Sequence, residues 1–348
     1  MRARNAAASV VVVMLACTAH WAVPVFRHAL EREHVVAGWS LRGSDFLWAA
    51  GALYSLMVAA WMLRTRAPAV SSSLRALTVL AGFIRAPRAM LAKGLQPADR
   101  LAVLSTLLKG FFGPLMVMSM LGFCVGAWTG LERLGSTGFA SAHGVTWFDR
   151  YGFWLALQTI LFVDVCLFTL GYLIESDRLG NRIRSVDPTV LGWAAALLCY
   201  PPFNAMTGAI LGSQHEDFPQ FADATVHIAA NAAIIGLMAV YAAASVALGL
   251  KASNLTHRGI VSCGPYAWVR HPAYACKNIA WWIGSVPLVS LAFDRGVSEG
   301  VMALASVLGW TLLYVLRALT EEDHLRKVDG EYSAYATRVR HRFIPGLI

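Results

Sequence analysis

The sequence predicts an all-α, polytopic integral membrane protein with about eight transmembrane helices. Three observations predict this class. Of the 348 residues, 57% are hydrophobic and only 14% are charged, and the mean hydropathy is +0.55. The apolar residues gather into blocks close to the length of about 20 residues that a membrane span requires. The basic residues lie mostly on every second connection between these blocks.

The expected spans follow from these blocks, taken in chain order. The first begins after an N-terminal pair of arginines, and because no clear cleavage site precedes Trp21 we expect it to be retained rather than removed as a signal peptide. The eight spans are expected at about residues 8–26, 45–63, 111–130, 153–174, 190–211, 226–250, 272–293 and 301–319.

The distribution of Lys and Arg predicts the orientation of the chain. If the N-terminus is inside, 21 of the 29 basic residues fall on inner segments. This is the positive-inside pattern, and it predicts that both termini are cytoplasmic. The net charge of +9 therefore needs no nucleic-acid partner. The inner segments are residues 1–7, 64–110, 175–189, 251–271 and 320–348.

The longest polar connection, residues 64–110, carries apolar residues at roughly helical spacing among arginines and lysines. This pattern predicts one or two amphipathic helices on the inner leaflet. The alternative is an ordinary connector with a solvated face. The apolar positions are Leu74, Leu77, Leu80, Ile84 and Leu91.

Polar residues interrupt three of the expected spans. Asp164 and Asn231 lie inside apolar blocks, and Asn204 follows the paired prolines Pro201 and Pro202. An Asp at the centre of a membrane helix costs roughly 2.5–3.5 kcal/mol on insertion scales, so such groups face a protein interior. They predict a polar pocket, with hydrogen bonding between helices as the alternative.

The six cysteines form no CxxC pair and no Cys/His metal spacing, so we expect neither a disulfide nor a metal site. They stand at positions 17, 124, 166, 199, 263 and 276.

The stretch from Gly264 to Tyr274 brings Arg270, His271 and three aromatic rings to the mouth of an expected span. Pro272 fits the first turn of a helix, so the span should begin there. A residue before proline is pushed toward an extended conformation, which leaves Arg270 and His271 beside a positive helix start. Such a corner can hold a carboxylate or a phosphate.

A second cluster closes the last expected span, from Arg317 through Glu321 and Glu322 to His324. Arg317 and Glu321 are four residues apart, so both should point to one side of the helix. On its own, this spacing is also typical of a plain salt bridge at the membrane edge.

Together, the two clusters resemble the isoprenylcysteine carboxyl methyltransferase (ICMT) family and the related membrane phospholipid methyltransferases. These families carry an Arg-His-Pro-x-Tyr motif and a downstream Glu-Glu pair. Here the motif is followed by a span, a short outer turn, another span and the glutamate pair, and then by the Gly330-Glu331-Tyr332-x-x-Tyr335 segment. The resemblance covers residues 251–348.

The resemblance implies a methyltransferase whose cofactor, S-adenosylmethionine, binds on the cytoplasmic side. Arg317 matches the family's arginine at the substrate and is the candidate catalytic residue. One upstream cofactor position falls on Arg258, with His257 one residue earlier, and these two are alternatives. The other candidate cofactor residues are Tyr266, Arg270, His271, Pro272, Tyr274, Glu321, Glu322 and the backbone of Gly259, Ile260 and Val261.

The residue types agree with this assignment on physical grounds. An ammonium group prefers a carboxylate, a carboxylate prefers Arg, His or a helix N-terminus, and a sulfonium tolerates aromatic faces. One departure is Cys276, where relatives often have glycine.

The resemblance also suggests how the chain is divided. We expect residues 1–150 to form an N-terminal membrane region, and residues 151–348 to form a methyltransferase-like core with its cofactor motifs in 251–348.

The expected function is methyl transfer to a lipophilic acceptor that arrives from the bilayer, in a bacterial inner (cytoplasmic) membrane. The acceptor is an isoprenylcysteine-type carboxylate, a lipid amine or a thiol. One alternative is an NADPH-dependent membrane reductase of related architecture, although Ala273 stands where those enzymes favour Asn. The other is a non-enzymatic scaffold or transporter.

Overall fold

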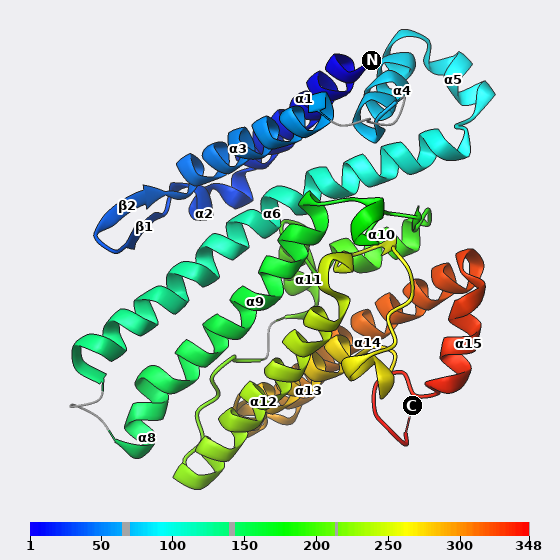
Figure 1. The fold of residues 1–348 in the computed structure, drawn as a ribbon. Helices are drawn as coiled ribbons and strands as arrows, with labels where there is room; N and C mark the ends of the chain where they lie inside the picture. Colours follow the sequence, from blue (N-terminus) through cyan, green and yellow to red (C-terminus); the bar gives the residue numbers. More distant parts are fainter. Residues whose placement is uncertain (65–69, 139–142, 213–214, 348) are drawn as a thin grey trace.

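The computed structural model describes residues 1–64, 70–138, 143–212 and 215–347, and it is almost entirely helical. In Figure 1 the long helices run side by side, with α6 against α9, α9 against α12, and α13 between α12 and α14. The N-terminal half contains α1 (Arg2–Ala22), α2 (Arg27–Glu31), β1 (Glu33–Val36), β2 (Trp39–Arg42), α3 (Gly43–Arg64), α4 (Ser72–Arg85), α5 (Pro87–Lys93) and α6 (Pro97–Arg133).

The C-terminal half carries the remaining helices and two two-residue strands. β3 pairs with β4, which joins two connections that are about 70 residues apart in the sequence. These elements are α8 (Gly144–Trp147), α9 (Phe153–Leu173), β3 (Ser185–Val186), α10 (Val190–Leu197), α11 (Phe203–Leu211), α12 (Ala224–Leu248), β4 (Thr256–His257), α13 (Pro272–Arg295), α14 (Val297–Val328) and α15 (Gly330–Arg338).

Among the described residues, six helices are long and apolar enough to cross a membrane. The all-α membrane class is confirmed, and the count of eight is not. The six helical runs are Arg2–Ala22, Gly43–Arg64, Pro97–Ser136, Gly144–Leu173, Ala224–Lys251 and Val297–Val328.

The other two expected spans differ from the prediction in different ways. The 190–211 block is two helices of 8 and 9 residues, α10 and α11, because the chain breaks at Pro201 and Pro202. At 1.5 Å per residue each is roughly half the thickness of the hydrocarbon core. α13 begins at Pro272, as expected, and is 24 residues long, but it is not among the six apolar helices.

Two further boundaries correct the prediction. Residues 72–93 do form two short helices, α4 and α5, but α6 starts at Pro97, well before the expected residue 111. α14 continues to Val328, so the charged cluster expected to close the last span lies within the helix.

Three apolar clusters form the interior of the described part of the chain, and the two larger ones hold the long helices together. One surrounds α6, where Leu108 and Phe112 are fully buried and Phe112 stacks on Tyr172 of α9. The other cluster joins α9, α12 and α13 around Phe153 and Ile234.

Two of the polar residues within the expected spans, Asp164 and Asn231, form hydrogen bonds inside this bundle. Asp164 accepts hydrogen bonds from Tyr241 and Ser245, and the side-chain nitrogen of Asn231 donates to the carbonyl of Pro219.

Candidate active site

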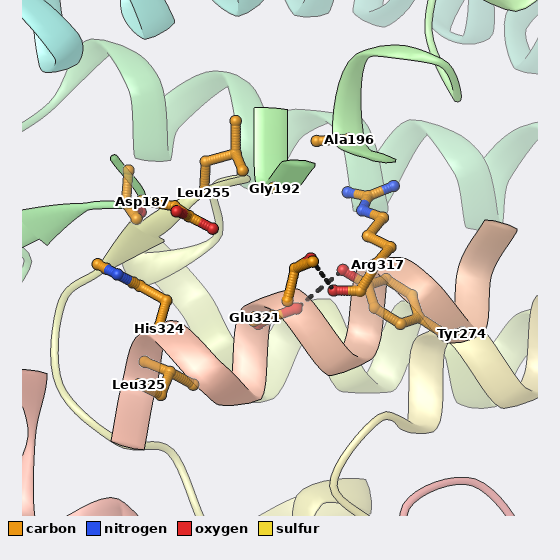
Figure 2. Close-up of a pocket in the computed structure, with 11 residues that line it drawn as sticks. Asp187, Gly192, Ala196, Leu255, Tyr274, Arg317, Glu321, His324 and Leu325 are labelled. Atoms are coloured by element: carbon orange, nitrogen blue, oxygen red, sulfur yellow. Dashed lines mark hydrogen bonds between the residues drawn. The ribbon is translucent and has the colours of Figure 1, made fainter. Parts of the chain in front are cut away.

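A pocket lies between the last turns of α14 and the chain from Asp187 to Ala196. Figure 2 shows Arg317, Glu321 and His324 rising from α14 toward this segment, with Tyr274 of α13 beside them. The cavity itself is small, about 20 Å³, and the unfilled space around it, which includes open solvent, is about 370 Å³. The lining residues are Asp187, Gly192, Ala196, Leu255, Thr256, Tyr274, Arg317, Thr320, Glu321, His324 and Leu325.

The helical repeat of α14 explains why three charged or titratable side chains line one pocket. Arg317, Glu321 and His324 are spaced by four and then three residues, so they share one face of the helix. Arg317 and His324 are buried, whereas Glu321 is exposed. The expectation that Arg317 and Glu321 point to one side of the helix is therefore confirmed, and His324 extends the same face.

Glu321 is anchored to the neighbouring helix rather than to Arg317. The Tyr274 hydroxyl donates to Glu321 Oε2 at 3.0 Å, drawn as a dashed line in Figure 2. The Tyr274 ring in turn stacks on His271, with ring centroids 5.4 Å apart. Glu321 Oε1 has no hydrogen-bond partner among the described residues, so it is available to a cationic ligand.

Arg317 is surrounded by aromatic rings instead of carboxylates. Its guanidinium carbon lies 5.0 Å from the ring centroid of Tyr274, 5.4 Å from that of Tyr200 and 5.8 Å from that of Tyr314. One guanidinium nitrogen donates to the side-chain oxygen of Asn254. No carboxylate of the described residues lies within ion-pair distance of Arg317, so these residues supply no direct counter-ion for its charge.

Glu322, the other member of the pair, has the opposite environment. It is fully buried, and its oxygens lie 2.8 Å from Arg270 Nε, 3.2 Å from His271 Nε2 and 2.7 Å from Arg326 Nη2. Arg342 lies at 3.2 Å. The corner at the start of α13, expected to hold an anion, is thus filled by the Glu322 carboxylate.

Arg270 extends this cluster to the C-terminal segment. Its Nη1 donates to the carbonyls of Val339 and Arg340 at 2.8 Å and 2.6 Å. The structure therefore brings Arg270, His271 and Glu322 together as an internal ion cluster behind the pocket wall. Their expected contact with a cofactor stays a prediction.

Of the two candidates upstream of the motif, His257 lies on β4 and Arg258 directly follows it. His257 is buried, and its Nε2 is 2.8 Å from Asp329 Oδ2. Burial lowers the pKa of His257 more than Asp329 raises it. Arg258 is also buried and donates to the carbonyl of Asn181 at 2.8 Å, while its Nε and Nη2 have no partner among the described residues. Burial lowers the pKa of Arg258 as well, against the opposing effect of Glu175.

The remaining candidates shape the connection between β4 and α13. Gly259 has a φ of +102°, a conformation that favours glycine. Ile260 packs against the buried Tyr332 and Tyr335 of α15. The carbonyl of Tyr266 accepts a hydrogen bond from the Tyr335 hydroxyl at 2.9 Å, and burial raises the pKa of the Tyr266 hydroxyl. Neither these residues nor Val261 and Pro272 line the pocket.

Sequence reasoning missed several pocket residues. His324 belonged to the second sequence cluster but was not named as a site residue, although continuing the helical repeat of Arg317 and Glu321 for one more turn points to it. Asp187 and Gly192 carried no sequence signal, because only the pairing of β3 with β4 brings them to α14. Asn254, which holds both Arg317 and the Tyr172 hydroxyl, lies on a connection whose position depends on the same pairing.

The chemistry of the pocket fits an amphoteric, sulfonium-bearing cofactor. Two carboxylates, Glu321 and Asp187, suit an ammonium group, and the Tyr274 ring suits a sulfonium. Asp187 Oδ1 is held by the backbone and hydroxyl of Thr189, which orients the carboxylate. A Cβ on Gly192 would lie 2.0 Å from Asp187 Oδ2, so only glycine leaves room there.

Comparison with known proteins agrees with this arrangement. Residues 226–327 match the family model of the isoprenylcysteine carboxyl methyltransferase (ICMT) family. Neither the curated proteins nor the solved structures that were compared with the chain contain a significant match. The matched region spans α12, α13 and nearly all of α14, the helices that carry Tyr274, Arg317 and Glu321. Over residues 226–327 the chain is therefore similar to the isoprenylcysteine carboxyl methyltransferase family.

Proposed function

We propose that this protein transfers a methyl group from S-adenosylmethionine to a lipophilic acceptor in the membrane, with the donor site on the cytoplasmic side. The observation that carries the proposal is the face of α14 on which Arg317, Glu321 and His324 line one pocket with Tyr274, inside a region of methyltransferase family membership. When bound, S-adenosylmethionine supplies an electrophilic methyl group.

Glu321 and Asp187 hold the donor's ammonium group in this proposal. Glu321 has an oxygen free for this purpose because Tyr274 occupies the other one. The Tyr274 ring, fixed by its stacking on His271, faces the positive sulfonium. Arg270, His271 and Glu322 position this wall through their ion cluster, and the backbone of residues 259–261 remains the proposed contact for the adenosine.

Arg317 orients the acceptor. It is buried at the deep end of the pocket, is surrounded by three tyrosines and retains an unneutralised charge. Methyl transfer from a sulfonium is an in-line displacement, so the protein's contribution is to align the acceptor with the donor and to exclude water. The tyrosines around Arg317 supply both the alignment and the dry environment.

The test is transfer of radiolabelled methyl from S-adenosylmethionine into a lipid extract by membranes that contain the protein. We expect an organic-soluble labelled product with the wild type. Glu321→Gln and Arg317→Gln should each reduce its formation by roughly 10 to 100 fold, since each removes a charge-assisted interaction of about 1.5–3 kcal/mol.

Asp323→Asn is the matched control, because Asp323 is exposed on the same helix and pairs only with Lys327. It should leave activity unchanged. Absence of label from every fraction, together with no binding of S-adenosylmethionine by the purified protein, would refute the proposal.

A further inference from the structure

A second cation lies near the Tyr314 ring, which also neighbours Arg317, and has no assigned role. Lys277 lies in the second turn of α13, with its ammonium nitrogen 5.0 Å from the ring centroid of Trp281 and 5.7 Å from that of Tyr314. No carboxylate of the described residues is within ion-pair distance of it. The aromatic rings around it carry no charge that could compensate its own.

Lys277 and Arg317 belong to one constellation. Both cationic groups lie within 6 Å of the Tyr314 ring centroid, at 5.7 Å and 5.8 Å. Cys199 and Tyr200, at the break between α10 and α11, are close enough to both cations to interact with them electrostatically. The break between α10 and α11, within the predicted 190–211 span, therefore lies next to α13 and α14 near Lys277 and Arg317.

The acidic groups nearest to the two cations are already engaged. Asp164 is close enough to interact electrostatically with Lys277, but its oxygens accept hydrogen bonds from Tyr241 and Ser245. Glu321 accepts from Tyr274 and is not within ion-pair distance of either cation. Two positive charges therefore remain without a counter-ion from the described part of the chain.

We propose that the methyl acceptor is an acidic amphiphile whose head carries two negative charges, held jointly by Arg317 and Lys277. This inference rests on the proposed function and narrows its acceptor class. A lipid amine would meet two like charges, and a single carboxylate would leave one cation uncompensated. A phosphate monoester suits both partners, because arginine binds it through a planar fork and lysine as a point charge.

The surroundings of Lys277 suit the apolar part of such a molecule. Trp281 packs against Trp310 and Tyr314, with ring centroids 6.0 Å and 5.3 Å apart, and His215 lies against Trp281 at 4.7 Å. A lysine ammonium that contacts aromatic rings and has no carboxylate of the described residues within ion-pair distance is placed to receive the charged end of an amphiphile.

The test measures binding of three probes with the same alkyl chain to the purified full-length protein in a neutral detergent. Dodecyl phosphate, dodecanoate and dodecylamine differ only in head charge, and at pH 7.5 the phosphate is mostly doubly charged. Titration is followed by intrinsic tryptophan fluorescence. We expect the wild type to bind the phosphate most tightly and the amine least.

Lys277→Gln should weaken phosphate binding by at least about tenfold and change carboxylate binding much less. Lys277→Arg should restore phosphate binding, and Lys93→Gln, which removes an exposed lysine of α5, should match the wild type. Equal phosphate affinity of the wild type and Lys277→Gln, or amine binding as tight as phosphate binding, would overturn the inference.

Binding of S-adenosylmethionine to the same preparations separates this inference from the proposed function. If the protein binds the cofactor but Lys277→Gln does not change phosphate binding, only the proposed acceptor class is refuted. Phosphate binding that depends on Lys277, without any cofactor binding, would refute the methyltransferase and leave the anion site in place. Intact cofactor binding by Lys277→Gln would also establish that the variant is folded.

Discussion

Two neighbouring glutamates at the end of the last membrane helix have opposite environments. Glu321 is exposed to the pocket and accepts one hydrogen bond, from Tyr274. Glu322 is fully buried among Arg270, His271 and Arg326. Successive residues of a helix point about 100° apart, so adjacent carboxylates reach different surroundings. The first suits ligand binding, and the second suits stability.

Exchange of each glutamate for glutamine separates these roles. Glu322→Gln leaves the buried Arg270 without its counter-ion, and loss of one partner from a buried ion pair costs about 3–5 kcal/mol. We expect a large fall in the thermal unfolding midpoint of the detergent-solubilised protein. Glu321→Gln is the matched control and should unfold near the wild-type temperature. Equal midpoints for the two variants would contradict the assignment.

The pH dependence of stability should carry a contribution from His257. Burial lowers its pKa below the ordinary 6.5, and Asp329 opposes that shift only in part. The unfolded chain then binds a proton at a higher pH than the folded chain does. The contribution of His257 is therefore fully present above about 6.5 and is lost as the pH falls through that value toward the folded pKa.

Thermal unfolding between pH 7.5 and pH 5 tests this prediction. The wild-type midpoint should fall as the solution becomes more acidic, and His257→Asn should fall less steeply. His28→Asn is the control, because His28 is an exposed histidine on α2. A slope in His257→Asn as steep as in the wild type would show that other groups cause the decline.

At the scale of elements, the site depends on a close approach between α9 and the connection after α12. Gly171 of α9 faces the backbone of Ala252, and a Cβ at that position would lie 2.1 Å from the Ala252 carbonyl oxygen. Two residues further on, the backbone and side chain of Asn254 bond to the Tyr172 hydroxyl, and Asn254 also accepts from Arg317. The packing of α9 therefore decides where Arg317 is held.

Gly171→Ala should displace this connection. Overpacking of a buried contact typically costs about 1–3 kcal/mol, so we expect a lower unfolding temperature and weaker methyl transfer. Gly236→Ala is the control, because nothing lies within 4 Å of the added Cβ on α12. It should be neutral or slightly stabilising. Wild-type stability and activity in Gly171→Ala would show that the connection can shift without harm to the site.

At the scale of the whole molecule, the two ends of the bundle differ. Figure 1 shows α4, α5 and α15 at one end of the long helices, and the β1–β2 hairpin and α8 at the other. α4, α5 and α15 belong to segments predicted to be cytoplasmic, whereas the β1–β2 hairpin and α8 belong to segments predicted to be outside. The arrangement of the helices is therefore compatible with the orientation inferred from the basic residues.

Cysteine labelling tests this orientation. Cys263 is exposed on the connection that leads to α13, and Ser40 lies on the hairpin strand β2. A membrane-impermeant maleimide should label Cys263 in inverted vesicles and not in intact cells. A Ser40→Cys variant should gain additional label only in intact cells. Cys263→Ala is the control that shows which part of the label is on Cys263. The reverse pattern would invert the predicted topology.

The limits of prediction followed from the range of the interactions. The start of α13 at Pro272 and the shared face of Arg317 and Glu321 were predictable because they depend on neighbours within one or two turns. The early start of α6 at Pro97 was missed, because the helix continues through a polar stretch that hydropathy assigns to a connection. The internal use of Glu322 was also missed, since its partners come from three separate segments.

The sequence by itself determined the membrane class, the predominance of helices, the resemblance to a methyltransferase family and the residues on one face of α14. These depend on composition and on local spacing, which the chain carries wherever it folds. Only the tertiary structure decided that Asp187 lines the pocket and Asn254 bonds to Arg317, that Glu322 pairs with Arg270, and that Arg317 and Lys277 lie near the same tyrosine ring. Burial and charge compensation are properties of groups brought together from distant parts of the chain, so no local pattern contains them.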